Sequence, residues 1–416
     1  MEKFFTPNSV AVIGASSKKG KIGYEILKNV LRSGVKTYPV NPKRKEILGL
    51  KCYPTVEDIN DEVELAVIAV DAERCVDVIE RCGRKGIKYA VVISGGFKEA
   101  GREDLEKAMV EVARKYGIRI IGPNCIGVYN GRNGFNTFFQ RNVQLPPAGN
   151  VAILTQSGTF GIALLEKFAQ ESIGVGKFVS YGNKADVDEV DLIEYFLGDE
   201  ATGVIAMYVE DIGRRFFEKD FSKPTIILKA GRSKLGQRAA SLHTGAMASR
   251  YEIFRGVCRQ KGVIAADDFE EFFGVAKIIA MQGLPKGNKI DIITNGAGPS
   301  VLACDFIENT ELELAGDVID LTGSATASDY IKAIDESRAD IILLTFVFQD
   351  APLAETLDEL YREIAKRKKF FIALAMGGNF VEEQRKKLAQ LSIPLFEEPR
   401  VAIKSLNRVV EYAMRK

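Results

Sequence analysis

The stretch VAVIGASSKKGKIG, from Val10 to Gly23, decides the fold of the first part of the chain. An apolar run ends at Gly14, a loop of Gly, Ser and Lys follows, and helical periodicity begins near Ile22. Such a turn exposes backbone N–H groups and a helix N-terminus, which attract phosphate groups. The stretch predicts a βα unit with a phosphate-binding turn. The alternative is a tight turn without a ligand.

Strands and helices alternate along the first part of the chain. Apolar runs predict strands at 9–13, 37–40, 65–70, 89–94 and 119–121, and helical periodicity falls at 22–31, 73–82 and 103–116. Strand, helix and strand in this order are typical of a parallel sheet that is covered on both faces.

Two joints rich in Pro and Gly divide the chain, LPPAG at 145–149 and GLPKG at 283–287. Between them, strands are expected at 151–154, 176–180, 203–208 and 225–229; after the second joint they are expected at 289–294, 341–346 and 370–375. We therefore expect an α/β protein with parallel sheets and three domains, at 1–145, 149–283 and 287–416.

The composition excludes several classes of protein. The 57 basic and 56 acidic residues leave no global field to attract nucleic acid or an anionic membrane. The six cysteines contain no CxxC pair, which favours a reduced, cytoplasmic setting. No apolar run approaches the roughly 18 residues of a membrane-spanning helix, and the N-terminus lacks the apolar region of a signal peptide.

The ligand of the first turn is better matched by CoA than by NAD. Ser16 occupies the second glycine position of the dinucleotide pattern, and the second strand ends in YPVNPK at 38–43, without an acidic residue for ribose hydroxyls. Lys43 offers a cation instead, which suits the additional phosphate on the ribose of CoA. The alternatives are a solvated Lys43 and, less favoured, an NAD(P)-dependent oxidoreductase.

Three more loops follow predicted strands. ISGGF at 93–97 and GPNCIG at 122–127 lie where open α/β sheets bind ligands, although each could be an ordinary turn. In LTQSGTFG at 154–161, the segment from Ser157 to Thr159 opens a helix and could hold an anion. Its alternatives are a capped helix start at Ser157 and a nucleophilic serine, which the missing G-x-S-x-G pattern disfavours.

His243 is the single histidine of the chain, in AASLHTGAM at 239–247. One histidine excludes a multi-histidine metal site, and we predict no metal ligands. A neutral imidazole can take and return a phosphoryl group if a carboxylate fixes its tautomer. Glu210 ends a predicted strand and could serve. The alternatives are a structural histidine and a solvated loop acid.

Together these segments resemble the ADP-forming acetyl-CoA (acyl-CoA) synthetases, relatives of succinyl-CoA synthetase. The resemblance runs through almost the whole chain and includes GASSKKGKIG, YPVNPK, GPNCIGV, TQSGTFG, LHTGA and TNGAGPS. It implies an N-terminal CoA-binding Rossmann domain followed by two flavodoxin-like ligase domains. Departures are Leu242, where the relatives usually carry serine, and shortened segments after Glu210 and Glu313.

The resemblance also implies roles for single residues. His243 would be phosphorylated, Glu210 would orient it, the helix start Ser157, Gly158 and Thr159 would steady the phosphohistidine, and Asn124 would lie near the reacting centre. CoA would contact Gly14, Ser16, Ser17, Lys18, Lys19, Lys43, Ile93, Ser94 and Gly95.

The implied reaction needs a nucleotide site that the sequence does not display. There is no G-x-x-x-x-G-K-[ST] loop and no recognisable ATP-grasp domain. We therefore expect a partner subunit that carries the ATP-grasp domain, Mg²⁺ and ADP or ATP, in a heterotetramer. A CoA-binding regulatory or scaffold protein without turnover is the alternative. The sequence leaves open the acyl group and the choice between ADP and GDP.

Overall fold

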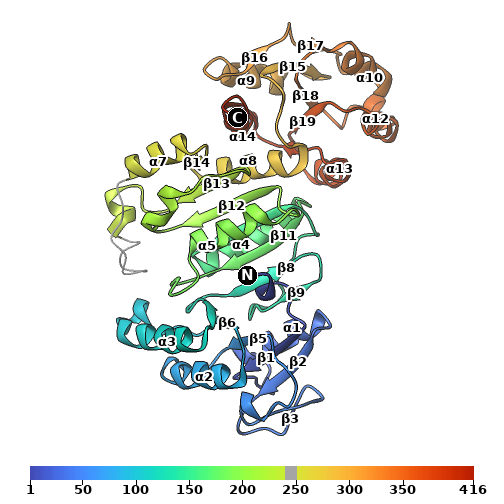
Figure 1. Cartoon of the computed structure of the whole chain (residues 1–416). Coiled ribbons are helices and arrows are strands. Elements are labelled where there is room, and N and C mark those ends of the chain that lie inside the picture. Colours follow the sequence, from blue (N-terminus) through green and yellow to red (C-terminus); the bar gives the residue numbers. More distant parts are fainter. Residues whose placement is uncertain (239–250) are drawn as a thin grey trace. The chain divides into compact units, whose positions relative to one another are not determined.

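The computed structural model describes residues 1–238 and 251–416, which fall into two compact units. Unit 1 is Met1–Ala169 with Gly174–Val257, and unit 2 is Gln170–Ile173 with Cys258–Lys416 (Figure 1). Leu242 and His243 lie outside the described residues. The domain boundaries expected at the two joints stay predictions.

The first sheet of unit 1 is parallel, with the strand order β2-β1-β5-β6-β7. Its strands are β1 (Ser9–Ile13), β2 (Lys36–Val40), β5 (Leu65–Ile68), β6 (Tyr89–Val92) and β7 (Arg119–Ile121). The chain leaves β1 toward β2 on one side and continues through β5 on the other. The order therefore reverses beside β1, and such a switch point opens a ligand crevice at the carboxyl ends of the strands.

Helices cover this sheet as the periodicity predicted. They are α1 (Ile22–Arg32), α2 (Ala72–Lys85) and α3 (Glu103–Tyr116), and Figure 1 shows α2 and α3 side by side. Alternate strand residues such as Ala11, Ile68 and Val92 form one apolar core with α2 and α3. A short hairpin follows β2, β3 (Glu46–Ile47) with β4 (Leu50–Lys51). The strands and helices predicted here are confirmed, with small shifts at their ends.

The turn after β1 requires glycine at two positions. Gly14 has a φ of +89°, and a Cβ there would lie 2.2 Å from the Ala69 carbonyl oxygen. A Cβ on Gly23, in the first turn of α1, would lie 1.9 Å from the Gly14 carbonyl oxygen. The first turn of α1 therefore packs directly against the backbone of the loop.

Replacing Gly23 with Ala is expected to lower the free energy of unfolding by about 3 kcal/mol, because a rigid backbone contact must open to admit the methyl group. Denaturant unfolding measures this. Gly256→Ala is the matched control: Gly256 is exposed in α7 (Tyr251–Gln260) with nothing within 4 Å of the added atom. That change should stabilise by roughly 0.5–1 kcal/mol. Equal stability of the Gly23 variant and the wild type would contradict the packing argument.

The second sheet of unit 1 runs in the order β13-β12-β10-β11-β8-β9. Its strands are β8 (Gly127–Asn130), β9 (Phe135–Asn136), β10 (Val151–Thr155), β11 (Val175–Ser180), β12 (Val204–Val209) and β13 (Thr225–Lys229). The helices α4 (Gly158–Gln170) and α5 (Glu189–Gly198) follow β10 and β11. Short 3-10 turns lie at Glu2–Phe4, Val56–Asp58, Lys98–Ala100 and Arg214–Glu218.

Sequence periodicity did not predict β8 and β9, and β8 is antiparallel to its neighbour β11. Residues 122–126 are all that separates β8 from β7. The chain therefore passes directly from the first sheet into the second, where β8 pairs with β11 and the turn at 131–134 leads back into the edge strand β9.

Unit 2 contains a parallel sheet in the order β16-β15-β18-β19-β20, with β17 beside β15. The strands of unit 2 are β14 (Ile264–Ala266), β15 (Lys289–Thr294), β16 (Glu313–Leu314), β17 (Ile319–Asp320), β18 (Ile341–Phe346), β19 (Phe370–Ala375) and β20 (Leu395–Phe396). Its helices are α8 (Phe269–Gln282), α9 (Ala297–Ile307), α10 (Ala327–Glu336), α11 (Ala351–Ala354), α12 (Leu357–Ile364), α13 (Asn379–Gln390) and α14 (Pro399–Ala413).

The predicted fold class, an α/β protein with parallel sheets, is confirmed, apart from the antiparallel edge at β8. Among the described residues, no helix combines the length and the apolar character needed to span a membrane.

Candidate functional site

A cavity of 640 Å³ in unit 1 joins loops from both of its sheets. The first sheet contributes the ends of β5, β6 and β7, and the second contributes the start of α4. The predicted site residues that line it are Ile93, Ser94, Gly95, Asn124, Ser157, Gly158 and Thr159. Residues that are more than sixty positions apart in the sequence thus meet around one space.

A second cavity of 380 Å³ lies at the carboxyl ends of β1 and β2 and is lined by Gly14 and Lys43. Val70 lines both cavities, so the two spaces adjoin. Arg74 also lines the second cavity, in the first turn of α2. No ion pair is found for Lys43 or Arg74 within the described part of the chain, whereas Arg81 is paired with Asp77 at 2.8 Å. The second cavity therefore presents two cations to an anion.

In the rest of the predicted CoA loop, Ser17, Lys18 and Lys19 are exposed and Ser16 is half-buried. The Ser16 hydroxyl accepts a hydrogen bond from the Lys18 N–H at 3.1 Å, which closes the loop on itself. Lys19 lines a third cavity, of 520 Å³, beside α1. Ser16, Ser17 and Lys18 line none of these three cavities.

A chain of amides and acids holds Asn124 at the wall of the 640 Å³ cavity. Asn124 has a φ of +57°, and its N–H donates to the Ser94 carbonyl at 2.8 Å. Its side-chain amide donates to Asn183 Oδ1 at 3.2 Å, and the Asn183 amide donates to Glu99 at 2.6 Å and to Glu106 at 2.8 Å. Asn183 lies in the glycine-containing loop after β11, in the segment VSYGNKADVDEVDLIEY that shares the resemblance, but the sequence did not single it out as a site residue.

The pKa values of Glu99 and Glu106 are shifted in opposite directions. Burial opposes ionisation of Glu99, but hydrogen bonds from Asn183 and from the Gly96 N–H outweigh it and lower the pKa of Glu99. Burial raises the pKa of Glu106, which has fewer compensating donors. Because the Asn183 side-chain nitrogen donates to both acids, its Oδ1 atom faces Asn124 and accepts the hydrogen bond from the Asn124 amide.

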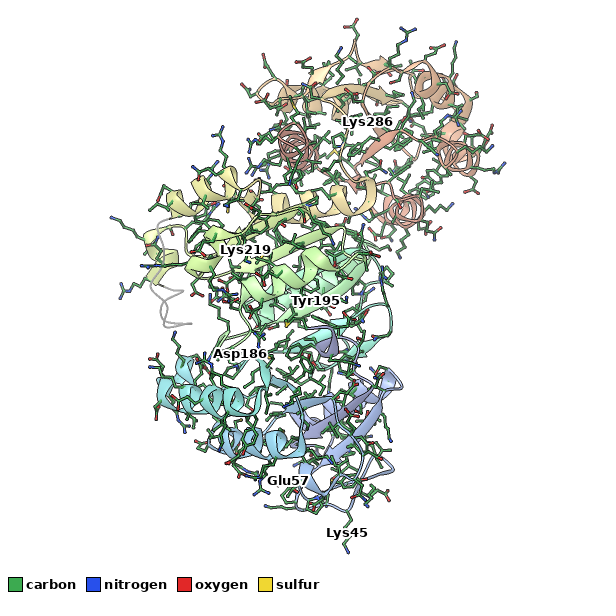
Figure 2. All side chains as sticks on the ribbon, in the orientation of Figure 1. Lys45, Glu57, Asp186, Tyr195, Lys219 and Lys286 are labelled. Carbon is green, nitrogen blue, oxygen red and sulfur yellow. The ribbon has the colours of Figure 1, made fainter. Side chains whose placement is uncertain are left out.

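The loop after β11 fastens the second sheet to the first. A Cβ on Gly182 would lie 2.2 Å from the Pro123 carbonyl oxygen, so the two loops touch through their backbones. Asp186, labelled in Figure 2, accepts the Ile120 N–H at 2.8 Å and Arg119 Nε at 2.9 Å. The cavity between the sheets is thus lined by loops with fixed separations.

The start of α4 presents an anion-binding helix end to the 640 Å³ cavity. The Ser157 hydroxyl accepts the Phe160 N–H at 3.3 Å, as an N-cap residue does. Thr155 Oγ1 donates to the Ser157 carbonyl at 2.8 Å. Since the first N–H groups of a helix have no partner inside the helix, those of Gly158 and Thr159 are suited to an anion.

Glu210 follows β12, the strand next to β10, and its side chain is buried. Gln156 fixes the backbone here: its Oε1 accepts the N–H of Glu210 at 2.5 Å and that of Asp211 at 3.1 Å. Lys229, 2% exposed, donates to the Glu210 carbonyl at 3.0 Å. Gln156 lies inside the quoted TQSGTFG segment, and its role was missed because a side-chain bond across two strands has no sequence signal.

Buried and half-buried acids and lysines surround Glu210. Lys184 Nζ lies 3.1 Å from Glu189 and 3.2 Å from Asp211. Burial lowers the pKa of Lys229, and the nearby acids Asp211 and Glu210 oppose that shift. The described residues contain no group of metal ligands there or elsewhere.

Comparisons with known proteins agree with this architecture. A family model described as a CoA binding domain matches residues 8–131, and one described as a succinyl-CoA ligase like flavodoxin domain matches residues 148–279. The alpha subunits of acetate–CoA ligases [ADP-forming] I and II of Pyrococcus furiosus are 39% and 36% identical to the chain, over 99% of it and 98% of each relative. The chain belongs to the ADP-forming acetate–CoA ligase family.

Longer relatives and solved structures place the chain further within the ADP-forming ligase family. Acetate–CoA ligase [ADP-forming] I of Archaeoglobus fulgidus is 38% identical over 99% of this chain, which spans 64% of that relative's length. The Ca. Korarchaeum cryptofilum dinucleotide forming acetyl-coenzyme A synthetase 1, solved in complex with phosphate and ADP, matches with a TM-score of 0.91. That match is 34% identical and covers 99% of this chain and 97% of the solved one.

The resemblance stated from the sequence is therefore confirmed, and so is the expectation that the chain is part of an acid–thiol ligase. The alternatives of an oxidoreductase and of a regulatory protein are not favoured, because the relatives named here are ligases or synthetases.

Proposed function

We propose that the chain is the CoA-binding, phosphohistidine-carrying subunit of an ADP-forming acyl-CoA synthetase. It interconverts acyl-CoA, ADP and phosphate with a carboxylic acid, ATP and CoA. The observation that carries the proposal is the 640 Å³ cavity. It is lined both by loops of the first sheet, in the region that matches a CoA binding domain, and by the start of α4. The likeness to alpha subunits over 98% of their length supports it.

CoA is proposed to lie across the two adjoining cavities. Its 3′-phosphate meets the cations Lys43 and Arg74, and its diphosphate follows the loop from Ser16 to Lys19. The pantetheine arm then passes Val70 and carries the thiol into the 640 Å³ cavity. The lining by Ile93, Ser94 and Gly95 supports this path.

The chemistry proposed for the cavity is acyl transfer followed by phosphoryl transfer. Phosphate attacks the thioester carbonyl, the carbon–sulfur bond breaks, and CoA leaves as the thiol with the proton that phosphate gives up. Asn124 can donate its amide to the reacting oxygen, and the N–H groups at Ser157 to Thr159 can hold phosphoryl oxygens. The acyl phosphate then gives its phosphoryl group to the imidazole of His243 and releases the carboxylate. Glu210 is proposed to accept the other ring N–H and stabilise the charged ring.

His243 is proposed to pass the phosphoryl group to ADP. The ADP is bound by a partner subunit, whose ATP-grasp domain also holds Mg²⁺. The alpha-subunit names of the relatives support a partner. A heterotetramer and a cytoplasmic location complete the proposal; the six cysteines, all of them free, agree with a reducing compartment. The acyl group stays unassigned.

The decisive experiment incubates the purified complex of the chain and its partner with ATP labelled in the γ-phosphate. We expect label on this chain that is labile to acid, stable to base and discharged by ADP, as a phosphoramidate is. The chain without its partner is the control and should stay unlabelled. A complex that shows neither this label nor release of ATP from acyl-CoA, ADP and phosphate would contradict the proposal.

A further inference from the structure

Gln156 joins the start of α4 to the segment that carries Glu210. It lies between Thr155, the last residue of β10, and Ser157, whose hydroxyl caps α4. Its backbone N–H donates to the Tyr208 carbonyl at 3.1 Å, which extends the pairing of β10 with β12 by one step. Its side chain reaches the residues that follow β12. One short segment therefore both leads into the anion-binding helix end and contacts the backbone of the proposed orienting acid.

The Gln156 side chain makes three hydrogen bonds to Glu210 and Asp211. Its Oε1 accepts the N–H of Glu210 at 2.5 Å and that of Asp211 at 3.1 Å, and its Nε2 donates to Asp211 Oδ1 at 2.6 Å. Gln156 is 8% exposed, so these bonds are shielded from water and are costly to lose. Because they reach two consecutive N–H groups and a side chain, they restrain the orientation of the 210–211 backbone as well as its position.

Two lysines hold the carbonyl side of the same backbone. Lys229 donates to the Glu210 carbonyl at 3.0 Å, and Lys184 donates to the Asp211 carbonyl at 3.3 Å. Both N–H groups and both carbonyls of residues 210 and 211 are thereby engaged, and Gln156 supplies the partner for the N–H groups. Of these three described side chains, the one of Gln156 belongs to a residue that lines the 640 Å³ cavity.

A neutral amide fits position 156 because it accepts and donates at once. The two backbone N–H groups need an acceptor, whereas the Asp211 carboxylate, whose other oxygen lies 3.2 Å from Lys184, takes a donor. A carboxylate at position 156 would satisfy the N–H groups but would repel Asp211. A methionine of similar length would satisfy neither. The chemistry of the glutamine therefore matches both demands of the segment.

We infer that Gln156 is a positioning residue for the phosphorylation of His243. It acts through Glu210, because it fixes the backbone from which that carboxylate is proposed to reach the imidazole, and it ties this backbone to the helix end that is proposed to hold the phosphoryl group. The inference rests on the proposed function and adds a residue to its site. A misplacement of about 1 Å can slow a reaction by roughly 10²-fold, so the phosphoryl step depends on Gln156 more than CoA binding does.

The test is a cycle of variants in the complex of the chain and its partner, read by rapid-quench labelling with ATP that carries label in the γ-phosphate. Gln156→Glu should slow labelling by about 10- to 100-fold, the range typical of lost contacts behind a reacting group. Asp211→Asn combined with Gln156→Glu lets the new amide at 211 donate to the new carboxylate at 156. The double variant should label within about threefold of Asp211→Asn alone. A double variant as slow as Gln156→Glu would overturn the inference.

Gln156→Met separates positioning from a general loss of structure. It keeps the length of the side chain and removes its acceptor and its donor. Labelling should slow by about 10- to 100-fold, whereas CoA affinity and the single-turnover yield of acyl phosphate should stay within about twofold of the wild type. Gln144→Met, at an exposed position, is the control and should label at the wild-type rate.

Two results with Gln156→Met would overturn the inference: labelling at the wild-type rate, or equal losses in labelling, CoA binding and acyl phosphate formation. The double variant keeps the groups around position 156 paired, so its result decides if Gln156→Met does not fold. A wild-type complex without acid-labile label would instead contradict the proposed function itself.

Discussion

His243→Ala is expected to abolish labelling of the chain by ATP and to lower ATP formation by at least about a thousandfold, because the chain has no second histidine to take the phosphoryl group. Initial rates of ATP release from acyl-CoA, ADP and phosphate measure this. CoA binding should persist, since the proposed contacts lie on other loops, at Lys43 and Ser94 among them.

The order of the proposed steps sharpens this expectation. Acyl phosphate forms before the imidazole acts, so the His243→Ala complex should still convert acyl-CoA and phosphate into acyl phosphate and CoA in a single turnover. Gly256→Ala, an exposed change in α7, is the control and should keep full activity. Acid-labile label on the His243→Ala chain would show that another residue carries the phosphoryl group.

Glu210→Gln is expected to slow phosphorylation of the chain by roughly 10²–10⁴-fold, because an amide cannot stabilise a charged imidazole or fix its tautomer as a carboxylate does. The fold should survive. The contacts of Glu210 with Gln156 and Lys229 use its backbone N–H and carbonyl, which the substitution leaves in place. Rapid-quench measurement of label transfer from ATP gives the rate.

Glu218→Gln is the matched control for the Glu210 variant. Glu218 is exposed at the end of the Arg214–Glu218 turn and is part of the same connection between β12 and β13. The control should phosphorylate at the wild-type rate, and both variants should bind CoA with unchanged affinity. If Glu210→Gln were as fast as the control, the orienting role would belong to a different acid.

The elements that the sequence predicted well are those whose cause is local. Parallel strands buried on both faces read as apolar runs, as in β1 and β18, and their ends were placed within a few residues. The antiparallel β8 was missed because it is defined by its pairing with the later strand β11. Pairing with a strand that comes later is not encoded in any short window.

The residues of the candidate site also fall into two groups, those with a local sequence signal and those without one. Gly14, Ser157 and Thr159 were found in advance, since a glycine or a hydroxyl residue between a strand and a helix has a local physical meaning. Gln156 and Asn183 were not singled out. Their importance comes from what lies opposite them: the backbone N–H groups of Glu210 and Asp211 for the first, and two acids of another segment for the second.

By itself, the sequence determined the α/β class, the glycine-rich turns and a single histidine able to carry a phosphoryl group, because periodicity, backbone sterics and side-chain chemistry belong to short stretches or single residues. Only the tertiary structure decided which loops meet. The carboxyl ends of β5, β6 and β7 open onto the start of α4 because the strand orders and the backbone contact of Gly182 with Pro123 bring two sheets together. Distances between residues remote in the sequence depend on that packing and on no local pattern.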